Sequence, residues 1–149
     1  MKPVKNYIIS VSQGTGCYRH IRISGDETLF DLHEAILDAF EFFDDHAHAF
    51  FMNNRAWDES QAYYADFIED EENFTTDVTL DELKLAPGKK FLYIFDFGEE
   101  WRFQCRVLKV TDTGEGGAEI VRSVGESPDQ YPDYEDEDWD EDEEDDDEP

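Results

Sequence analysis

The sequence predicts an α+β fold in which one long helix packs on a face of a mostly antiparallel, twisted sheet. Paired runs of alternating apolar and polar residues, separated by turns that contain glycine, predict β-hairpins at 5–24 and 90–110. One amphipathic segment with apolar residues at helical spacing, 29–42, lies between these hairpins. This arrangement favours a helix packed on a sheet around one core, and a length of 149 residues suits a single domain.

The N-terminal part of the chain carries the first predicted hairpin and the long helix. Alternation in 5–12 and 17–24, on either side of a Gln-Gly-Thr-Gly turn, predicts two paired strands. Thr28 then stands where a helix N-cap is expected, and Asp31, three residues later, fits a capping box. The helix is therefore expected to begin at residue 29 and to bury its apolar stripe against the sheet.

The C-terminal part is predicted to add four strands and one short helix. A strand at 46–52 precedes an irregular, aromatic-rich excursion at 53–78 and a short helix that Thr79 caps and that ends at Leu85. The remaining strands are expected at 90–97, 101–110 and 119–124. The predicted order is β-β-α-β-α-β-β-β, for which a β-grasp-like layout is the nearest named arrangement.

The net charge of −28 is distributed unevenly along the chain. Sixteen of the 40 acidic residues follow Gly125, where no Lys or Arg occurs, so we expect a folded domain at 1–125 and a disordered acidic tail at 126–149. This excess of negative charge disfavours direct binding of nucleic acid, which requires Lys and Arg to displace counterions from phosphates. A local basic patch can survive around Arg19, Arg22, Lys89, Lys90, Arg102 and Arg106.

The sequence shows none of the segments that direct a protein to export or to a membrane. The N-terminal residues lack the apolar stretch of a signal peptide, and no run approaches the roughly 20 apolar residues of a membrane helix. Cys17 and Cys105 lie in strand-like runs without a CxxC spacing. We therefore expect a cytoplasmic protein that has both thiols reduced and no membrane contact.

Two histidines of the third predicted strand are candidate metal ligands. His46 and His48 lie two apart on a strand and are expected to share a face about 6.5–7 Å apart, which suits two imidazoles on one ion. A third ligand would come from Asp96, Glu99 or His20. The alternative is that both rings satisfy ordinary hydrogen bonds, and we expect no cofactor.

The carboxylates of the second hairpin tip allow two interpretations. Asp96 and Glu99 flank Gly98 there, and as a pair they are suited to acid–base work or to metal binding. In the alternative, Asp96 accepts backbone N–H bonds within the turn, and Gly98 supplies a positive φ. The sequence favours this second, structural interpretation over a functional one.

Two further side chains are candidate binding residues. Alternation places Arg19 on the expected core face beside Ile21, and a buried guanidinium needs a partner, for which we expect Asp96 or Glu99. Trp101 stands among phenylalanines and either lines a ligand pocket or belongs to the core. Of these two interpretations the core is favoured.

Four segments together resemble the plasmid pRiA4b ORF-3-like family, and they are YRHIRI (18–23), TLFDLHEAILDAF (28–40), HAHAF (46–50) and FDFGEEWRF (95–103). The resemblance covers roughly residues 5–125, and the phrase DFGEEW is its most specific part. It implies a family without an assigned function, some of whose members look like accessory proteins of mobile elements. Many members have a histidine where this chain has Phe103, a departure that weakens any histidine-dependent site.

Taken together, these features favour a non-enzymatic interaction or accessory domain that binds a protein partner. No Ser, Cys or Thr stands in a nucleophile elbow such as GxSxG, so we expect no catalytic residues. The acidic tail is suited to binding a basic protein. Two alternatives stay open: a metal-dependent, hydrolase-like site at His46, His48 and Asp96, and the accessory role in mobile-element DNA transactions that the resemblance implies.

Overall fold

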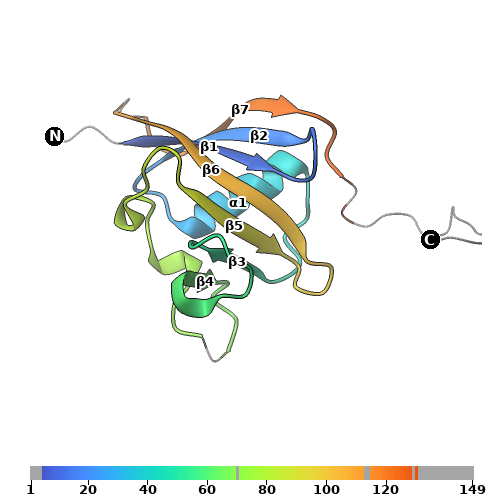
Figure 1. Cartoon of the computed structure of the whole chain (residues 1–149). Coiled ribbons are helices and arrows are strands. Elements are labelled where there is room, and N and C mark those ends of the chain that lie inside the picture. The colour runs from blue at the N-terminus through green and yellow to red at the C-terminus, as the bar shows by residue number, and fades with distance from the viewer. Residues whose placement is uncertain (1–4, 70, 113–114, 129, 131–149) are drawn as a thin grey trace, which may run out of the picture.

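The computed structural model describes residues 5–69, 71–112, 115–128 and 130. Within them, seven strands form one sheet in the order β4-β3-β5-β6-β1-β2-β7, and every neighbouring pair is antiparallel (Figure 1). The elements are β1 (Asn6–Ser12), β2 (Tyr18–Ser24), α1 (Leu29–Phe40), β3 (His48–Phe51), β4 (Ala62–Tyr64), β5 (Lys90–Phe95), β6 (Trp101–Thr111) and β7 (Ala118–Val124). The predicted antiparallel α+β architecture is confirmed.

Helix α1 begins and ends at residues that provide its caps. Thr28 Oγ1 accepts a hydrogen bond from the Asp31 N–H at 3.2 Å, and the Asp31 carboxylate accepts one from the Thr28 N–H at 2.9 Å, which confirms the predicted capping box. The helix ends after Phe40 because Glu41 adopts a left-handed conformation with a φ of 62° and donates its N–H back to the Asp38 carbonyl.

No helix in the described ranges has the length and apolar character needed to cross a bilayer.

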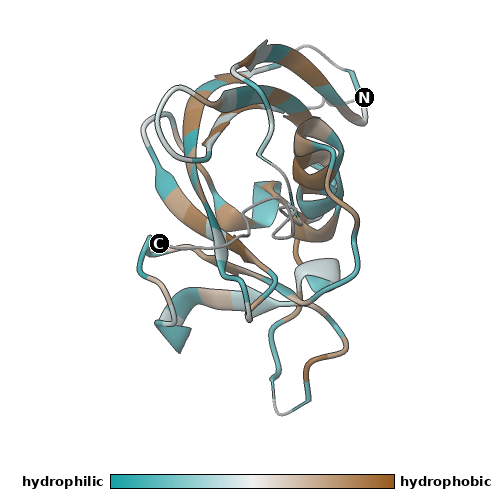
Figure 2. Cartoon of the chain, turned by 90° about the vertical axis from the view of Figure 1, so that its right-hand side faces the viewer, coloured by the Kyte–Doolittle hydropathy of each residue, from teal (hydrophilic) through white to brown (hydrophobic). Residues whose placement is uncertain are grey.

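Apolar side chains form two separate cores, one on each face of the sheet. The larger core lies between α1 and the sheet, which curves around the helix (Figure 2), and it contains fully buried strand residues such as Ile9, Tyr93 and Phe103. The second core lies on the opposite face, over β3, β4 and β5. The aromatic-rich excursion covers it, with the Trp57 ring edge-on to Phe51 at 5.4 Å.

Three elements differ from the sequence prediction. The predicted helix at 79–85 is a single 3-10 turn, Asp81–Leu83, because Lys84 adopts a left-handed conformation with a φ of 54° directly after it. The predicted irregular segment 53–78 contains a strand, β4, whose alternate side chains are buried in the second core. The third strand begins at His48, two residues later than expected. The β-grasp-like layout is not confirmed by this strand order.

The chain beyond β7 continues along the domain as far as the structure describes it. Arg19 donates a hydrogen bond to the Ser127 hydroxyl at 2.9 Å. Gln130 is buried, and its side-chain amide pairs with both backbone groups of Phe43, accepting from N–H at 2.7 Å and donating to C=O at 3.0 Å. The contacts of the domain therefore extend past the boundary predicted at residue 125, and the rest of the predicted tail, 131–149, lies outside the described residues.

Candidate functional site

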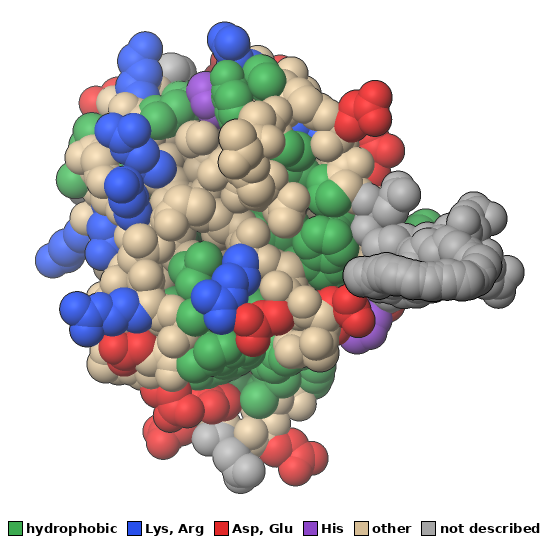
Figure 3. Space-filling view, turned by 45° about the vertical axis from the view of Figure 1, so that its right-hand side comes forward, with side chains coloured by type: hydrophobic (Ala, Val, Ile, Leu, Met, Phe, Trp, Pro, Cys, Tyr) green, Lys and Arg blue, Asp and Glu red, His purple; other side chains and the backbone are tan. Residues whose placement is uncertain are grey.

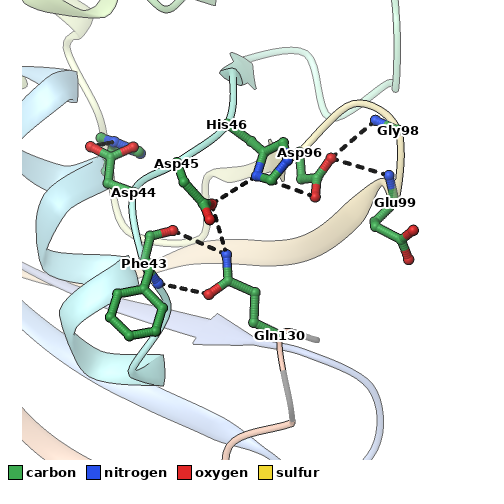
Figure 4. A network of polar contacts seen from close by, with 9 residues as sticks. Phe43, Asp44, Asp45, His46, Asp96, Gly98, Glu99 and Gln130 are labelled. Carbon is green, nitrogen blue, oxygen red and sulfur yellow. Dashed lines mark hydrogen bonds and ion pairs between the residues drawn. The ribbon is translucent and has the colours of Figure 1, made fainter. Parts of the chain in front are cut away.

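The tip of the hairpin between β5 and β6 is organised by the buried carboxylate of Asp96. Asp96 follows the last residue of β5 and adopts a left-handed conformation with a φ of 64°. Its Oδ1 accepts hydrogen bonds from the N–H groups of Gly98 at 3.2 Å and Glu99 at 3.3 Å (Figure 4). These bonds are the ones that the structural interpretation of the sequence expects, but its expectation of a positive φ at Gly98 was wrong, because Asp96 and Glu100 adopt the left-handed conformations of this turn. Asp96 therefore shapes the turn, whereas the Glu99 carboxylate is exposed and points away from it.

His46 joins this hairpin tip to the C-terminal segment through a chain of polar contacts (Figure 4). Its Nδ1 lies 2.7 Å from Asp45 Oδ1 and 3.5 Å from Asp96 Oδ2, and its ring meets Phe95 edge-on. The same Asp45 oxygen accepts a hydrogen bond from Gln130 Nε2 at 3.2 Å. The network therefore runs continuously from the Asp96 turn to Gln130, at a surface where 40% of the His46 side chain is exposed.

His48 belongs to a different group of residues, in the interior between α1 and the sheet. Its ring stacks on that of His33 from α1, with the centroids 3.6 Å apart and the planes 13° from parallel. Nε2 of His48 forms a hydrogen bond with Thr75 Oγ1 at 2.8 Å. Burial, followed by the charge that His33 would carry, lowers the pKa of His48 to about 2. His48 is therefore a neutral, packed ring at physiological pH.

The second ring of this stack is held by two oxygens. His33 Nε2 lies 3.0 Å from Asp44 Oδ2, and His33 Nδ1 lies 2.6 Å from the Tyr93 hydroxyl. An ionised Asp44 can only accept a hydrogen bond, which assigns the proton to Nε2 and leaves Nδ1 to accept from Tyr93. Burial lowers the pKa of His33, although Asp44 opposes this, and burial also raises the pKa of Tyr93 well above its ordinary value.

The structure thus places the two predicted metal-ligating histidines in different networks. His46 contacts the exposed carboxylate of Asp45 and the buried one of Asp96, while His48 faces the interior and stacks on His33. Within the described ranges, no group of three or more His, Cys, Asp or Glu side chains is arranged to hold a metal ion. His46 and Asp96 are brought together as expected, but His48 lies apart from them because strand β3 begins only at His48.

Arg19 is buried, as the alternation predicts, but the prediction that Asp96 or Glu99 is its partner was wrong. Its guanidinium donates hydrogen bonds to the carbonyls of Ala39 and Val124 at 3.1 and 2.8 Å, and to the Ser127 hydroxyl. It also lies over the Phe40 ring, 4.8 Å from the centroid. Ala39 supplies one of the last carbonyls of α1, which no helical N–H satisfies. Arg19 therefore links the helix end, strand β7 and the C-terminal segment, and among the described residues it forms no ion pair.

Trp101 lies at the edge of the core. Its ring meets Phe42 at 5.1 Å in an edge-to-face arrangement, and its indole nitrogen is buried without a hydrogen-bond partner in the described part of the chain. Together with Gln13, Glu99 and Arg102, Trp101 also lines a shallow surface hollow. Trp101 therefore packs against the core through Phe42, as the favoured interpretation expects, and also lines the hollow at the surface.

A row of mainly basic positions crosses the sheet face opposite α1, and we call it the basic row. It consists of directly opposed residues on β5, β6, β1, β2 and β7, which are, in that order, Lys90, Arg106, Ser10, His20 and Arg122. Directly opposed residues project to the same face of a sheet, so the row is continuous over roughly 19 Å. The residues that alternate with it on β5, β6, β1 and β2 are buried beneath α1, which places the row on the open face.

The charged side chains of the basic row, Lys90, Arg106 and Arg122, are exposed to solvent. Within the described residues, Lys90, Arg106 and Arg122 take part in no ion pair. Burial, followed by the charge of Arg122, lowers the pKa of His20, so this ring is mostly neutral at pH 7. Figure 3 shows Lys and Arg side chains gathered on one side of the molecule, with Asp and Glu along the bottom and the opposite side.

The sequence reasoning missed two of these features. His33 was not considered, although it stands between Leu29 and Ile36 at helical spacing and so belongs to the apolar stripe of α1. Arg122 was not included in the expected basic patch, because only the pairing of β2 with β7 brings it beside His20. The stripe was visible in the sequence, whereas the pairing of strands about 100 residues apart was not.

The fold and these clusters define an antiparallel α+β domain whose buried polar groups serve mainly to fix its own segments. The chain belongs to the family described as plasmid pRiA4b ORF-3-like protein, whose model matches residues 11–136. The resemblance seen in the sequence is therefore confirmed.

Comparison with solved structures and with curated proteins gives the fold but no activity. A crystal structure of a protein of unknown function, MM3350 from Methanosarcina mazei Go1, is similar to this chain with a TM-score of 0.63 and 22% sequence identity. The similarity covers 82% of this chain and 71% of that one. At this level of identity it shows a common fold. The comparison with curated proteins found no match.

Proposed function

We propose that this protein is a non-enzymatic accessory domain that binds a protein partner through oppositely charged surfaces. The observation that carries the proposal is the separation of charge. Three cations that form no ion pair among the described residues, Lys90, Arg106 and Arg122, lie on the open sheet face, while 14 of the 19 residues after Gln130 are acidic. Such complementary fields steer association with partners of the opposite sign. The acidic tail is the part that would contact a basic protein.

The environment of the titratable side chains supports an interaction role over a catalytic one. General acid–base catalysis needs groups whose pKa lies near the working pH and that can reach a substrate. His33 and His48 are instead buried and held neutral, and burial raises the pKa of the Cys105 thiol far above neutrality. Both cysteines are free thiols, and we place the protein in the cytoplasm, where thiols stay reduced.

A binding experiment with three baits tests this proposal. The baits are the full chain, a chain that ends after Gln130, and a peptide of residues 131–149, each immobilised and exposed to a cell extract. The middle bait keeps the Ser127 and Gln130 contacts, so any loss of binding reports on the tail and not on the domain. We expect the full chain to retain a basic protein that the shortened chain loses and that salt elutes, because exposed ion pairs are screened.

A neutral-tail variant provides the matched control. In this full-length chain the acidic residues of 135–148 are replaced by Asn and Gln, which keeps the length of the tail and removes its charge. It is expected to behave like the shortened chain. Identical partners for the full, shortened and neutral-tail chains would remove the proposed role of the tail.

The basic row favours one second candidate, the accessory role in mobile-element DNA transactions. Cations spaced along one face can contact phosphates. The net charge of −28 opposes this at long range, so a gel shift with duplex DNA at low salt is expected to show no complex. A shifted band that disappears in Arg106→Glu/Arg122→Glu would favour the DNA role instead.

A further inference from the structure

The basic row is a cationic surface without ion pairs to the described residues, in a chain with a large excess of acidic residues. Lys90 and Arg106 are direct cross-strand partners, a placement of like charges that destabilises a sheet. The chain has 40 acidic residues against 12 basic ones, yet in the part that the structure describes none pairs with Lys90, Arg106 or Arg122. A row of cations on an open sheet face fits an acidic peptide strand lying across it.

The acidic end of the same chain is within reach of this face. Gln130 is fixed by its bonds to Phe43, so residues 131–149 start from a defined point on the domain. Nineteen residues span up to about 60–70 Å when extended. A domain of this size has a radius of gyration of roughly 15 Å. The segment can therefore reach the basic row from its anchor.

Covalent attachment makes the tail the favoured occupant over any free acidic peptide. A segment tethered by a short flexible linker is present at an effective concentration of ~mM. Thirteen of the last fifteen residues are Asp or Glu, so many registers of the segment offer carboxylates to the three cations. A free acidic partner of ordinary cellular concentration must compete with this local excess.

We propose that the acidic segment 135–148 lies on the basic row when no partner is bound, and that a basic partner which takes the segment uncovers the row. This inference rests on the proposed function, because it assigns both charged surfaces of the binding domain to one another. The tail then acts as an internal cap, and the row and a basic partner compete for the same acidic segment. Binding of the partner and exposure of the sheet face are thereby coupled.

A nitroxide spin label at the end of the tail tests the contact in the full chain. The label is placed on Glu148→Cys in a Cys17→Ser background, and its broadening of backbone amide signals is measured by NMR. At low salt we expect loss of signal intensity at Ser10, His20 and Arg106 on the open face, and recovery of intensity near 1 M salt, where the screening length falls to about 3 Å.

Two charge-reversal variants with the same change in net charge give the decisive comparison. Arg106→Glu/Arg122→Glu alters the row. Lys5→Glu/Lys84→Glu is the control and alters two exposed residues outside the row, near the turn in which the Gly25 backbone bonds to Lys5 and Asp81. The broadening is expected to vanish in the first variant and to persist in the second. Equal broadening in both variants, or none in the parent chain, would overturn the proposal. Dispersed amide spectra of both variants show that they fold.

A nucleic acid is the other class of ligand that the row could accept, and the same sample separates it. A 20-nucleotide single strand is titrated into the labelled chain at low salt. We expect no binding, so the broadening stays unchanged. Saturable binding at the row in a parent chain that shows no broadening would overturn the proposal in favour of a nucleic-acid surface. A chain that shows no broadening can still bind a basic protein through its tail, so failure of the internal cap is distinguishable from failure of the proposed function.

Discussion

The stacked pair of buried histidines should make the stability of the domain fall as the pH falls below neutrality. In the folded state the pKa of His48 is lowered to about 2, whereas in the unfolded chain it has its ordinary value of 6.5. The unfolded chain therefore binds a proton that the folded chain does not, and the free energy of unfolding decreases once the pH drops below about 6.5. The pKa of His33 is lowered too, and it acts in the same direction.

The size of the effect follows from the cited pKa of His48. An unfolded pKa of 6.5 and a folded pKa of about 2 lower the free energy of unfolding by about 2 kcal/mol when the pH falls from 8 to 5. His33 adds to this loss. Glu27 and Glu34 act in the opposite direction, because their raised pKa values let the folded state bind protons first. This opposing background is common to parent and variant, so a comparison of the two isolates His48.

The measurement is urea unfolding followed by tryptophan fluorescence at pH 8, 7, 6 and 5, on the parent chain, His48→Gln and His46→Gln. Gln at position 48 can still bond to Thr75 but cannot take the proton, so its loss of stability over this range should be smaller by about 2 kcal/mol. His46→Gln changes an exposed ring and is expected to follow the parent. Parallel pH profiles for the parent and His48→Gln would refute the buried, neutral stack.

Two further substitutions test the structural roles of predicted site residues, each by the urea midpoint. Arg19→Met should destabilise by about 2–4 kcal/mol, since it leaves the carbonyls of Ala39 and Val124 without donors, and Arg19→Lys should recover part of the loss; equal losses for Met and Lys would contradict this. Asp96→Ala should cost about 1–3 kcal/mol by removing the acceptor of two turn N–H groups, while Asp96→Asn, which keeps an acceptor and tolerates a positive φ, should cost clearly less. Equal effects of Ala and Asn would show that the turn does not depend on that acceptor.

Local rules predicted those features that depend on neighbours in the sequence. The capping box of Thr28 and Asp31 is a contact between residues three apart, and it formed as expected. Alternation along β2 placed Arg19 on the buried face for the same reason, because the period of a strand is a local property. The fold class followed from these elements together.

Partners that come from distant segments were beyond the same rules. Arg19 meets Val124 and Ser127, more than 100 residues away, and no local pattern indicates that a carbonyl and a hydroxyl, in place of a carboxylate, satisfy its guanidinium. His46 and His48 were assigned to one face on the assumption that a strand already runs at residue 46. The strand begins at His48, so the alternation on which that pairing relied does not hold there.

The segment DFGEEW, which carries the family resemblance most specifically, has a physical role that unites the fold with the proposed function. Asp96 forms the turn with Oδ1 and reaches His46 with Oδ2, and His46 and Gln130 both contact Asp45. The hairpin tip is thus connected through three side chains to the residue from which the acidic segment departs. If the tail is to lie on the basic row, its starting point must be held, because a longer free segment lowers the effective concentration at the row. Phe43 holds Gln130 directly, and the turn motif supports the same residue through His46 and Asp45, so both would contribute to the strength of a contact made on the other face of the sheet.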